Sequence, residues 1–379
     1  MAVRILHAHS TFALGGKEAR AVRLMNAFGD AAEHVVLSAT PGALSARASV
    51  DPAVRVAYPS DAPSLAGLPG PLRLLRLARY MRRFDLVLTY NWGAFDAVMA
   101  HQIFGGPPLI HHEDGFNSDE AERLKSRRNI YRRIGLAGAH RLVVPSRQLR
   151  RIAQNAWGQP PHRVELIPNG VPVADYSAAP EKGAIPGFEP REGELVVGTL
   201  AGLRPVKNLT RLVRAFAAME TKAARLVIVG EGPESERIVA EARRLGVADR
   251  LHLPGFLPRP ARYLGLFDMF AISSDSEQFP ISLVEAMAAG LAVAATAVGD
   301  IPHMVSQDNR PLIVEPGDEA ALAAALDSLA QRPDLRRNIG TANRLKAAAE
   351  YDEKKMIAYY ARLYGEAIGA PHAFTGPSA

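Results

Sequence analysis

The sequence predicts an α/β protein built from two doubly wound, Rossmann-like domains that face a shared ligand cleft. Short β-branched runs alternate with longer stretches of helical period, as in parallel sheets wrapped by helices. This alternation stops once, between Pro168 and Gly193, where Pro, Gly and Ala dominate, and then restarts. The chain has 379 residues, more than a single hydrophobic core usually serves, so two domains fit its length.

The first domain is expected over residues 1–185. It begins with a strand over Val3–Ala8 and a helix over Lys17–Phe28 that Gly29 closes. Ser146 is placed to cap the helix after the last clear strand, because a Ser hydroxyl accepts a free helix-start N–H. The remaining strands are expected at Glu33–Ala39, Asp85–Tyr90, Leu109–His112 and Arg141–Pro145.

The second domain is expected over residues 186–350. Helices are predicted from Asn208, from Pro233 and over Ile281–Ala289, the last ended by Gly290. In the final segment, 351–379, a helix over Asp352–Ile368 is expected to return to the first domain, with Pro371–Ala379 as a frayed tail. The strands of this domain are expected at Leu195–Ala201, Arg225–Val229, Arg250–Leu253, Met269–Ser273 and Ala292–Ala297.

Composition narrows the class of protein. With 48% hydrophobic and 22% charged residues, the chain is neither disordered nor fibrous. It has no Cys, which excludes disulfides and thiolate metal sites and fits a reducing compartment. The start lacks the basic region and cleavage site of a signal peptide, and no run of ~18 apolar residues occurs. A cytoplasmic location without a membrane-spanning helix is therefore expected.

The net charge of +6 lies entirely in the first half. Through Glu192 there are 24 Lys and Arg against 17 Asp and Glu, and the rest has 21 against 22. Arginines repeat at helical spacing within 72–83 and again within 123–133. These faces suit either the anionic cytoplasmic surface of a membrane or ordinary solvated helices. Nucleic acid is not expected, because aromatic residues are not interleaved with the cations.

The segment SSDSEQFPISLVEAMAAG carries two carboxylates near a helix start. Glu277 lies in a loop after a strand, and Glu285 lies in the early turns of the next helix. Free N–H groups at a helix start bind phosphate, and Glu285 is suited to accept hydrogen bonds from ribose hydroxyls. The same pattern also fits a plain helix whose early Glu complements its dipole. The amides expected to be free belong to Phe279, Ile281, Ser282 and Leu283.

Two cations follow a strand of the second domain in the sequence LRPVKN. Arg204 and Lys207 stand at the carboxyl end of that strand, ahead of a helix. From one side they could reach a single diphosphate, Arg bidentately and Lys as a point charge. A solvated loop explains the pair equally well.

Two further patterns lie in the first domain. Gly15 and Gly16 allow close backbone approach before a helix, although the segment is not a phosphate-binding P-loop. The run IHHEDG brings four ionisable residues to the end of a strand. Adjacent histidines alternate faces, so a positioning or proton-handling role for one residue competes with a metal site. These four residues are His111, His112, Glu113 and Asp114.

Taken together, these segments resemble the GT4-type retaining glycosyltransferases of the GT-B fold. EQFPISLVEAMAAG matches the family's E-x7-E signature, and VGTLAGLRPVKNLTRLVRAF resembles its diphosphate-binding segment. LVVPSRQLRRIA, VELIPNGV, ARLVIVGEGPE and GGKEARAVRL resemble family segments in the same order. Departures occur at Gln278 and Asp300, where the family commonly has Gly, and at Asp114, where many relatives have His.

The resemblance implies roles for particular residues. Arg204 and Lys207 would bind the donor diphosphate, Glu285 the ribose, and Glu277 the transferred sugar. Backbone near Phe256 would contact the base. Residues Phe279, Pro280, Ile281, Ser282 and Leu283 would hold the sugar and phosphates, with Gly15 and Gly16 closing over them. In the first domain, His112 and Asp114 are the candidates for catalysis, and His111 and Glu113 for the acceptor side.

The resemblance also implies the reaction. A UDP- or GDP-sugar would donate its sugar, with retention and by a front-face route, to a glycan or lipid-linked acceptor. No cofactor or metal is expected, because cationic side chains take the place of the Asp-x-Asp metal clamp that this chain lacks. The alternatives are another nucleotide-sugar enzyme of this fold, such as a 2-epimerase, and a two-lobed binding protein without catalysis.

Overall fold

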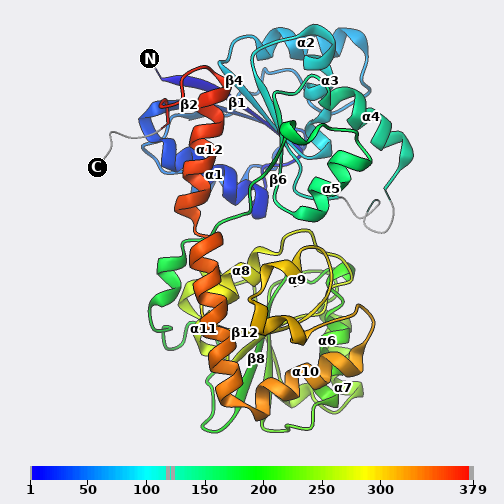
Figure 1. Cartoon of the computed structure of the whole chain (residues 1–379), viewed down its shortest axis with the longest axis vertical. Coiled ribbons are helices and arrows are strands. Elements are labelled where there is room, and N and C mark those ends of the chain that lie inside the picture. Colours follow the sequence, from blue (N-terminus) through cyan, green and yellow to red (C-terminus); the bar gives the residue numbers. More distant parts are fainter. Residues whose placement is uncertain (1, 117–119, 121–123, 375–379) are drawn as a thin grey trace. The chain divides into compact units, whose positions relative to one another are not determined.

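The computed structural model describes residues 2–116, 120 and 124–374, and it divides into two compact units. Unit 1 comprises residues 1–169 and 354–379, and unit 2 comprises residues 170–353. Each unit is a parallel sheet between layers of helices (Figure 1). The expected α/β class with two doubly wound domains is confirmed.

In its described part, unit 1 has a seven-stranded sheet in the order β3-β2-β1-β4-β5-β6-β7. All neighbouring strands are parallel. The strands are β1 (Val3–His9), β2 (Ala32–Ser38), β3 (Val56–Ala57), β4 (Leu86–Tyr90), β5 (Leu109–His112), β6 (Arg141–Val144) and β7 (Val164–Leu166). The helices are α1 (Gly16–Phe28), α2 (Pro71–Met81), α3 (Phe95–Phe104), α4 (Ser126–Leu136), α5 (Arg147–Asn155) and α12 (Glu353–Ala367).

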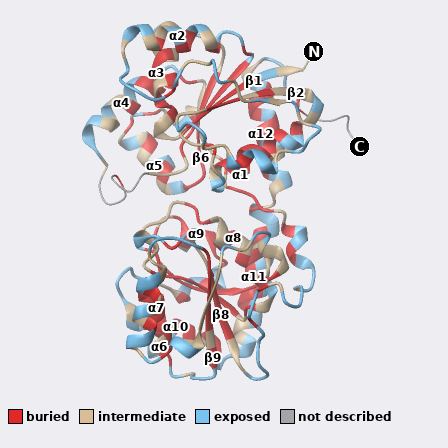
Figure 2. Cartoon of the chain, turned by 180° about the vertical axis from the view of Figure 1, so that it is seen from behind, coloured by how far each residue is buried: buried red, intermediate tan, exposed pale blue. Residues whose placement is uncertain are grey.

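Helices cover both faces of this sheet. One core joins the sheet to α2, α3, α4 and α5, and the other joins it to α1 and α12. Figure 2 shows the buried residues concentrated in the strands and on the inner sides of the helices. The expected cap is confirmed, because Ser146 Oγ accepts the Leu149 N–H at 3.0 Å and so starts α5.

Unit 2 has a six-stranded sheet in the order β10-β9-β8-β11-β12-β13 over its described residues. Its strands are β8 (Leu195–Leu200), β9 (Ala224–Val229), β10 (Leu251–Gly255), β11 (Met269–Ile272), β12 (Ala292–Thr296) and β13 (Ile313–Val314). Its helices are α6 (Leu209–Ala218), α7 (Ser235–Arg244), α8 (Ile281–Ala288), α9 (Ile301–Met304), α10 (Glu319–Gln331) and α11 (Pro333–Glu350). The order again places crossovers on both faces of a parallel sheet.

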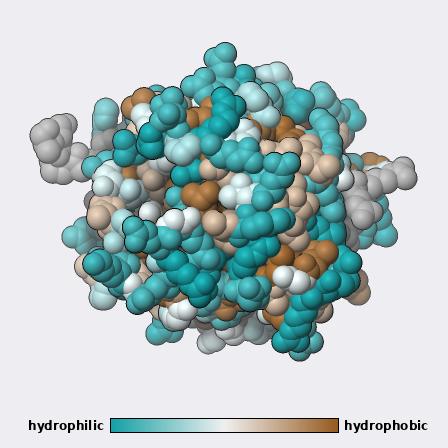
Figure 3. All heavy atoms as spheres, turned by 90° about the horizontal axis from the view of Figure 1, so that it is seen from below, coloured by the Kyte–Doolittle hydropathy of each residue, from teal (hydrophilic) through white to brown (hydrophobic). Residues whose placement is uncertain are grey.

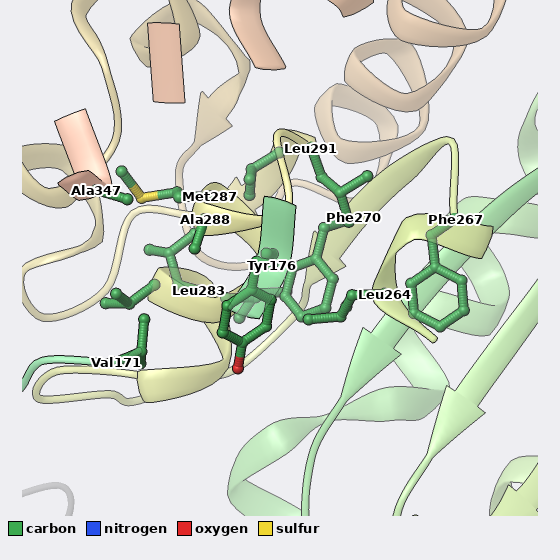
Figure 4. Packing of buried hydrophobic residues seen from close by; sticks show 14 of the residues in the cluster. Val171, Tyr176, Leu264, Phe267, Phe270, Leu283, Met287, Ala288, Leu291 and Ala347 are labelled. Carbon is green, nitrogen blue, oxygen red and sulfur yellow. The ribbon is translucent and has the colours of Figure 1, made fainter. Parts of the chain in front are cut away.

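The core of unit 2 extends further toward the N-terminus than expected. Tyr176, in the 3-10 turn Val173–Ser177, lies among Leu283, Met287 and Phe270 (Figure 4). Ile185 belongs to the same buried cluster. The boundary expected between residues 185 and 186 therefore falls inside unit 2, because these apolar side chains are buried against α8 and β11 rather than left in a solvated linker.

The C-terminal helix α12 packs in unit 1. Tyr360 and Tyr364 are buried in the core that also holds Tyr90 of β4. Among the residues that the structure describes, no helix is long and apolar enough to cross a membrane. The face of the molecule in Figure 3 is mainly hydrophilic, with hydrophobic residues in small separate groups. Part of the expected tail, residues 375–379, lies outside the described residues.

Candidate active site

Two loops of unit 2 bring a cation and a carboxylate together. The Lys207 Nζ and Glu277 Oε1 atoms form an ion pair at 2.5 Å, and Ser274 Oγ donates to the same oxygen at 2.7 Å. The loops follow β8 and β11, which are neighbours in the sheet. Neighbouring parallel strands open at the same edge, so these loops meet where α/β folds bind ligands. The Lys207 and Glu277 side chains are 18% and 10% exposed, and thus within reach of a ligand.

The first loop has a defined local structure. Residues Pro205–Lys207 form a 3-10 turn, with the Lys207 N–H donating to the Arg204 carbonyl at 2.9 Å. Asn208 follows in the left-handed region at φ 44°, which Asn tolerates better than most residues. Its side chain accepts the Arg211 N–H at 3.3 Å and so begins α6. The turn leaves the Arg204 side chain exposed, three residues from Lys207.

Hydrogen bonds and an ion pair fasten the two loops to each other. The Asp275 N–H donates to the Val206 carbonyl at 2.8 Å, and Asn208 Nδ2 donates to the Asp275 carboxylate at 3.1 Å. Arg211 Nη1 lies 2.7 Å from Asp275 Oδ1 and donates to the Ser273 carbonyl at 3.0 Å. These contacts fix the two loops that carry Lys207 and Glu277. The sequence analysis did not predict this network. No local signal identified Asp275 or Arg211, which lie 64 positions apart.

A glycine allows the second loop to pack against β12. Gly299 has φ +58°, and a Cβ at this position would lie 2.2 Å from the Glu277 carbonyl oxygen. The Asp300 N–H donates to the Gln278 carbonyl at 3.3 Å. Any side chain at residue 299 would therefore displace the backbone of Glu277. A Gly in the turn that follows a buried strand was a sequence signal for this close approach.

The start of α8 matches the expected anion-binding helix start only in part. Pro280 precedes the helix without a side-chain cap, and the Phe279 ring packs against Tyr351 with centroids 5.6 Å apart. The Leu283 N–H, expected to be free, donates to the Pro280 carbonyl at 3.1 Å because the first turn tightens. The Leu283 side chain lies in the core (Figure 4). Ile281 and Ser282 keep half-buried positions at the helix start.

Glu285 lies on the side of α8 toward the loop after β10. Burial, and next the charge of Glu285, raise the pKa of the Tyr263 hydroxyl. Tyr263 Oη donates to the Leu257 carbonyl at 3.2 Å, next to Phe256, which is 58% exposed. The Phe256 N–H donates to Glu231 Oε1 at 3.3 Å. Of the residues expected at the donor site, Glu285 and Phe256 thus lie near the same loop.

In unit 1, the two glycines stand where expected, at the start of α1. Gly15 is the N-cap in an extended conformation, without a side-chain cap. Lys17 and Glu18 form an ion pair in the first turn. Burial raises the pKa of Glu18, and the charge of Lys17 opposes that shift. A Cβ at Gly15 would lie 2.9 Å from Glu18 Oε2, so this position must stay small unless the Glu18 side chain moves.

The two histidines of the IHHEDG run are both buried, on opposite faces of β5. His111 Nδ1 lies 2.8 Å from Thr89 Oγ1, and its ring contacts Phe95 of α3. His112 Nδ1 and Nε2 lie 3.2 Å from the Thr89 carbonyl and 2.8 Å from Tyr364 Oη. Burial and the charge of Arg20 lower the pKa of His112 well below its usual value. The His112 ring therefore links β5 to α12 in the core, and its ring nitrogens already have partners.

The two acids of this run are also separated. Asp114 forms a bidentate pair with Arg20, Nη1 to Oδ1 at 2.5 Å and Nη2 to Oδ2 at 2.8 Å, and Arg20 also donates to Asn169 Oδ1 at 2.8 Å. Glu113 is buried, with Arg132 Nε 3.5 Å from its Oε2. The four residues thus do not converge on one point. Arg20 was missed, although it lies on the apolar side of a predicted helix, where an Arg needs a partner.

Among the described residues, no three His, Asp or Glu side chains are grouped so that they could hold a metal ion. The charged groups that the structure does bring together in unit 2 are Lys207 and Glu277, with exposed Arg204 three residues away. This arrangement is suited to an anionic ligand that also offers hydroxyl groups, because it combines fixed cations with a carboxylate acceptor.

Comparison with known proteins assigns both units. The family model described as "Glycosyl transferases group 1" matches residues 184–346, and the one described as "Glycosyltransferase Family 4" matches residues 5–175. N-acetyl-alpha-D-glucosaminyl L-malate synthase of Bacillus anthracis is 29% identical over 178 residues, 47% of each chain. D-inositol 3-phosphate glycosyltransferase of Kribbella flavida is 26% identical over 372 residues, 89% of this chain and 86% of that relative.

A second D-inositol 3-phosphate glycosyltransferase, from Segniliparus rotundus, is 29% identical over 229 residues, which are 57% of this chain and 51% of the relative. The chain therefore spans about half the length of this relative and of the Bacillus enzyme.

Solved structures agree on the fold. Anabaena HepE in complex with UDP has a TM-score of 0.77 at 19% identity, covering 96% of this chain and 100% of that chain. Sucrose-phosphate synthase from Thermosynechococcus elongatus has a TM-score of 0.77 at 20% identity, covering 97% and 100%. At these identities the likeness concerns the fold, which is GT-B. With two family models matching along most of its length and the motif order described above, the chain belongs to the GT4-type glycosyltransferases.

Proposed function

We propose that the protein is a retaining glycosyltransferase that moves a sugar from a nucleotide-diphosphate sugar to an acceptor hydroxyl. The observation that carries this proposal is the Lys207–Glu277 ion pair, held between two fastened loops at the ligand edge of unit 2. Lys207 and Arg204 bind the donor diphosphate, together with the N–H groups that begin α8. Glu277 accepts hydrogen bonds from the transferred sugar, and Glu285 from the ribose.

In the enzyme without donor, the Glu277 carboxylate is the counterion of the Lys207 ammonium. Without donor, Glu277 neutralises Lys207 at 2.5 Å. When the diphosphate arrives, it takes over the Lys207 ammonium, and the Glu277 carboxylate turns to sugar hydroxyls. Because the loops are fixed by Asp275, Asn208 and Arg211, neither group needs backbone movement for this exchange. Such preorganised charge is what stabilises a developing anion.

In the proposed reaction, the bond from the anomeric carbon to the diphosphate oxygen breaks. The acceptor oxygen bonds to that carbon on the same face, and the acceptor proton passes to the leaving diphosphate. The anomeric configuration is retained. Lys207 and Arg204 stabilise the negative charge that grows on the leaving group, and Glu277 balances the oxocarbenium character of the sugar. The leaving group acts as the base, which is consistent with His112 and Asp114 serving structure.

We propose UDP-sugars before GDP-sugars as donors, because HepE, which shares the fold, was solved with UDP and with UDP-glucose. For the acceptor, the named relatives act on L-malate and inositol 3-phosphate, both of which are anionic. A sugar acceptor or lipid-linked glycan in polysaccharide synthesis fits the excess positive charge of the first half. No metal is required in this proposal, so EDTA should leave activity unchanged.

The test is a donor panel on the whole protein. UDP-, GDP- and ADP-sugars are first ranked by thermal shift, since a ligand at 100 times its dissociation constant stabilises a protein by ~2.7 kcal/mol. The best donors are then incubated with sugar acceptors, and products are identified by mass spectrometry. A new glycoside with release of the nucleoside diphosphate supports the proposal. Release of a free epimerised sugar without any glycoside would contradict it.

We further propose that unit 1 attaches peripherally to the inner face of the cytoplasmic membrane. The exposed sides of α2 and α4 combine Arg76 and Arg79 with Leu72 and Ile130, which are 71% and 61% exposed. Arg73 does not contribute to this surface, because it pairs with Asp96 at 2.8 Å. Arg123, part of the expected cluster, lies outside the described residues.

Vesicle flotation tests this attachment. Leu72→Glu combined with Ile130→Glu should reduce binding to vesicles that contain phosphatidylglycerol. Leu345→Glu, at a 67% exposed site of unit 2, is the control and should bind like the parent protein. Equal flotation with neutral and anionic vesicles would contradict the attachment.

A further inference from the structure

Two adjacent serines directly after β11 hold different parts of the candidate active site. The Ser273 hydroxyl donates between the carbonyl oxygens of Lys207 and Asn208, which lie 3.1 and 3.0 Å from its Oγ. The Ser274 hydroxyl donates to Glu277 Oε1 at 2.7 Å. Both serines are buried. Ser273 therefore fixes the backbone of the loop that carries the cation, whereas Ser274 fixes the carboxylate itself.

The two carboxylate oxygens of Glu277 have different surroundings. Oε1 accepts from Lys207 Nζ at 2.5 Å and from Ser274 Oγ at 2.7 Å. For Oε2, the described part of the chain provides no hydrogen-bond donor. The Glu277 side chain is 10% exposed, so a ligand still has access to it. Oε2 is therefore the oxygen that is left for a ligand hydroxyl.

The arrival of a donor changes the contacts of Oε1. A diphosphate that binds the Lys207 ammonium removes one of its two hydrogen-bond donors, and the Ser274 hydroxyl remains. A carboxylate turns easily about its last side-chain bond, because that torsion has a broad energy minimum. With Ser274 in place, Glu277 keeps one oxygen on the protein and offers the other to the sugar. Without Ser274, the carboxylate could turn to follow hydroxyls at different positions of the ring.

The sheet sets the position of Ser274. Thr296 is the last residue of β12, and its Oγ1 donates to the Ser274 carbonyl at 2.7 Å. Thr296 is buried, and β12 is the parallel neighbour of β11, which Ser274 follows by two residues. A side chain fixed by two neighbouring strands holds its geometry more precisely than one on a free loop. The Glu277 carboxylate is thus oriented, through Ser274, by the rigid part of unit 2.

We propose that Ser274 is a positioning residue that sets the sugar specificity of the donor site. It acts through Glu277, whose Oε2 atom accepts a hydrogen bond from a hydroxyl at one position of a hexose ring and in one orientation. Such a site rejects the epimer, because the epimer leaves the carboxylate oxygen without its partner. The inference rests on the proposed function, in which Glu277 binds the transferred sugar.

The test compares donor epimers by isothermal titration calorimetry on the whole protein. UDP-glucose and its epimers at C2, C3 and C4 are titrated, and UDP is titrated alone. The parent protein should bind one of the four sugars at least about tenfold more tightly than one of its epimers, because hydrogen bonds to charged groups are worth more than neutral ones. Ser274→Ala should reduce this ratio to about two, with UDP affinity within about twofold of the parent value, because UDP carries no sugar.

Ser276→Ala is the matched control and should keep the parent ratio. Ser276 lies in the same loop, is half-buried, and among the described residues its side chain forms no hydrogen bond. Thr296→Val removes the hydroxyl that fixes the Ser274 carbonyl and should lower the ratio less than Ser274→Ala does. In a Glu277→Gln background, adding Ser274→Ala should change the ratio by less than about twofold, because the serine acts through that carboxylate.

An unchanged ratio in Ser274→Ala, or an equal drop in Ser276→Ala, would overturn the proposal. A loss of affinity by the same factor for UDP and all four sugars would also overturn it, because a merely structural role has that effect. If Ser274→Ala does not fold, an unchanged ratio in Thr296→Val counts equally against the proposal.

Sugar transfer by the parent protein is measured separately. A parent protein that distinguishes the epimers but forms no glycoside would contradict the proposed function and still support the role of Ser274, provided that Ser274→Ala lowers the ratio. A parent protein that forms a glycoside but binds all four sugars equally would overturn the role of Ser274 and leave the proposed function standing. A parent protein that binds none of the four sugars would overturn both.

Discussion

The two units share a parallel-sheet architecture but treat their charged side chains differently. In unit 2, Lys207 and Glu277 lie in loops beyond the strands and stay partly exposed. In unit 1, His7, His9 and His112 belong to the strands themselves and are buried beneath α1 and α12. The position of an ionisable residue relative to the end of a strand therefore matters more than its residue type. Ionisable groups in the loops beyond the strands can bind a ligand, whereas those within the strands are packed into the core.

The substitution with the largest expected effect on catalysis is Lys207→Ala. If unit 2 carries the chemistry, turnover should fall by about 10²–10³-fold, the range seen when a preorganised charge is removed from a transition state. The fold should survive, because the lysine lies in a loop beyond the strands and belongs to neither hydrophobic core of unit 2. Lys182→Ala, at an exposed site of the same unit, is the control and should keep parent activity. Initial rates with a fixed donor provide the measurement, and near-parent turnover in Lys207→Ala would remove the assigned role.

In unit 1, the corresponding substitution should instead lower the free energy of unfolding. Arg20→Met removes the buried bidentate partner of the Asp114 carboxylate, which is only 13% exposed, and breaking such a pair from one side costs about 3–5 kcal/mol. Urea unfolding gives the value. The exposed pair Arg337–Asp334 is the matched control, since Arg337→Met should change stability by less than about 1 kcal/mol. Equal effects of the two substitutions would mean that the buried pair is not structural.

Gly299→Ala tests whether the backbone behind Glu277 must stay where it is. The φ of +58° and the 2.2 Å contact with the Glu277 carbonyl predict a loss of stability of about 1–3 kcal/mol and a weaker donor affinity. Gly183→Ala, at φ +72° with nothing within 4 Å of the added Cβ, carries only the conformational cost. Donor affinity unchanged in Gly299→Ala, or lowered equally in both variants, would contradict a role for this contact.

The buried histidines of unit 1 predict a smaller, pH-dependent effect. Burial lowers the pKa of His34 to about 4, and lowers the pKa of its partner His7, 2.9 Å away, well below the usual value. Between pH 6.5 and 4, these two histidines are therefore protonated in the unfolded chain but still neutral in the folded chain. Stability is full above pH 6.5 and falls on acidification, by on the order of 1 kcal/mol per pH unit for each such histidine.

Urea midpoints from pH 7.5 to 4.5 check this slope. His34→Gln should flatten it, whereas His162→Gln, at an exposed position, should leave it unchanged. A stability that is constant between pH 7 and 5 would show that these histidines accept protons without unfolding.

Much of the fold could be predicted from local pattern. The strand expected at Val3–Ala8 is β1 (Val3–His9), and the helix expected at Ile281–Ala289 is α8 (Ile281–Ala288). The strands Val56–Ala57 and Ile313–Val314 were missed, because two residues are too few to show a period. The domain boundary was misplaced, because Tyr176 and Ile185 are apolar anchors within a Pro- and Gly-rich segment that reads as a linker.

The candidate site was predictable as a set of residues but not as a network. Motif spacing marked Lys207 and Glu277, yet their ion pair spans 70 positions. The Arg20–Asp114 pair spans 94 positions, and only the packing of α1 on the sheet brings those two groups together. Local sequence says which groups can ionise. The register of parallel strands decides which of them meet.

One measurement tests the central claim, that unit 2 binds a donor diphosphate through Lys207 and transfers its sugar with retention. Hydrolysis of the preferred α-linked nucleotide sugar is followed by NMR, with water as acceptor, before the released sugar mutarotates. We expect the α-anomer to form first with the parent protein and release to fall by about 10²-fold or more with Lys207→Ala. A β-anomer formed first, or equal release by the two proteins, would contradict the account.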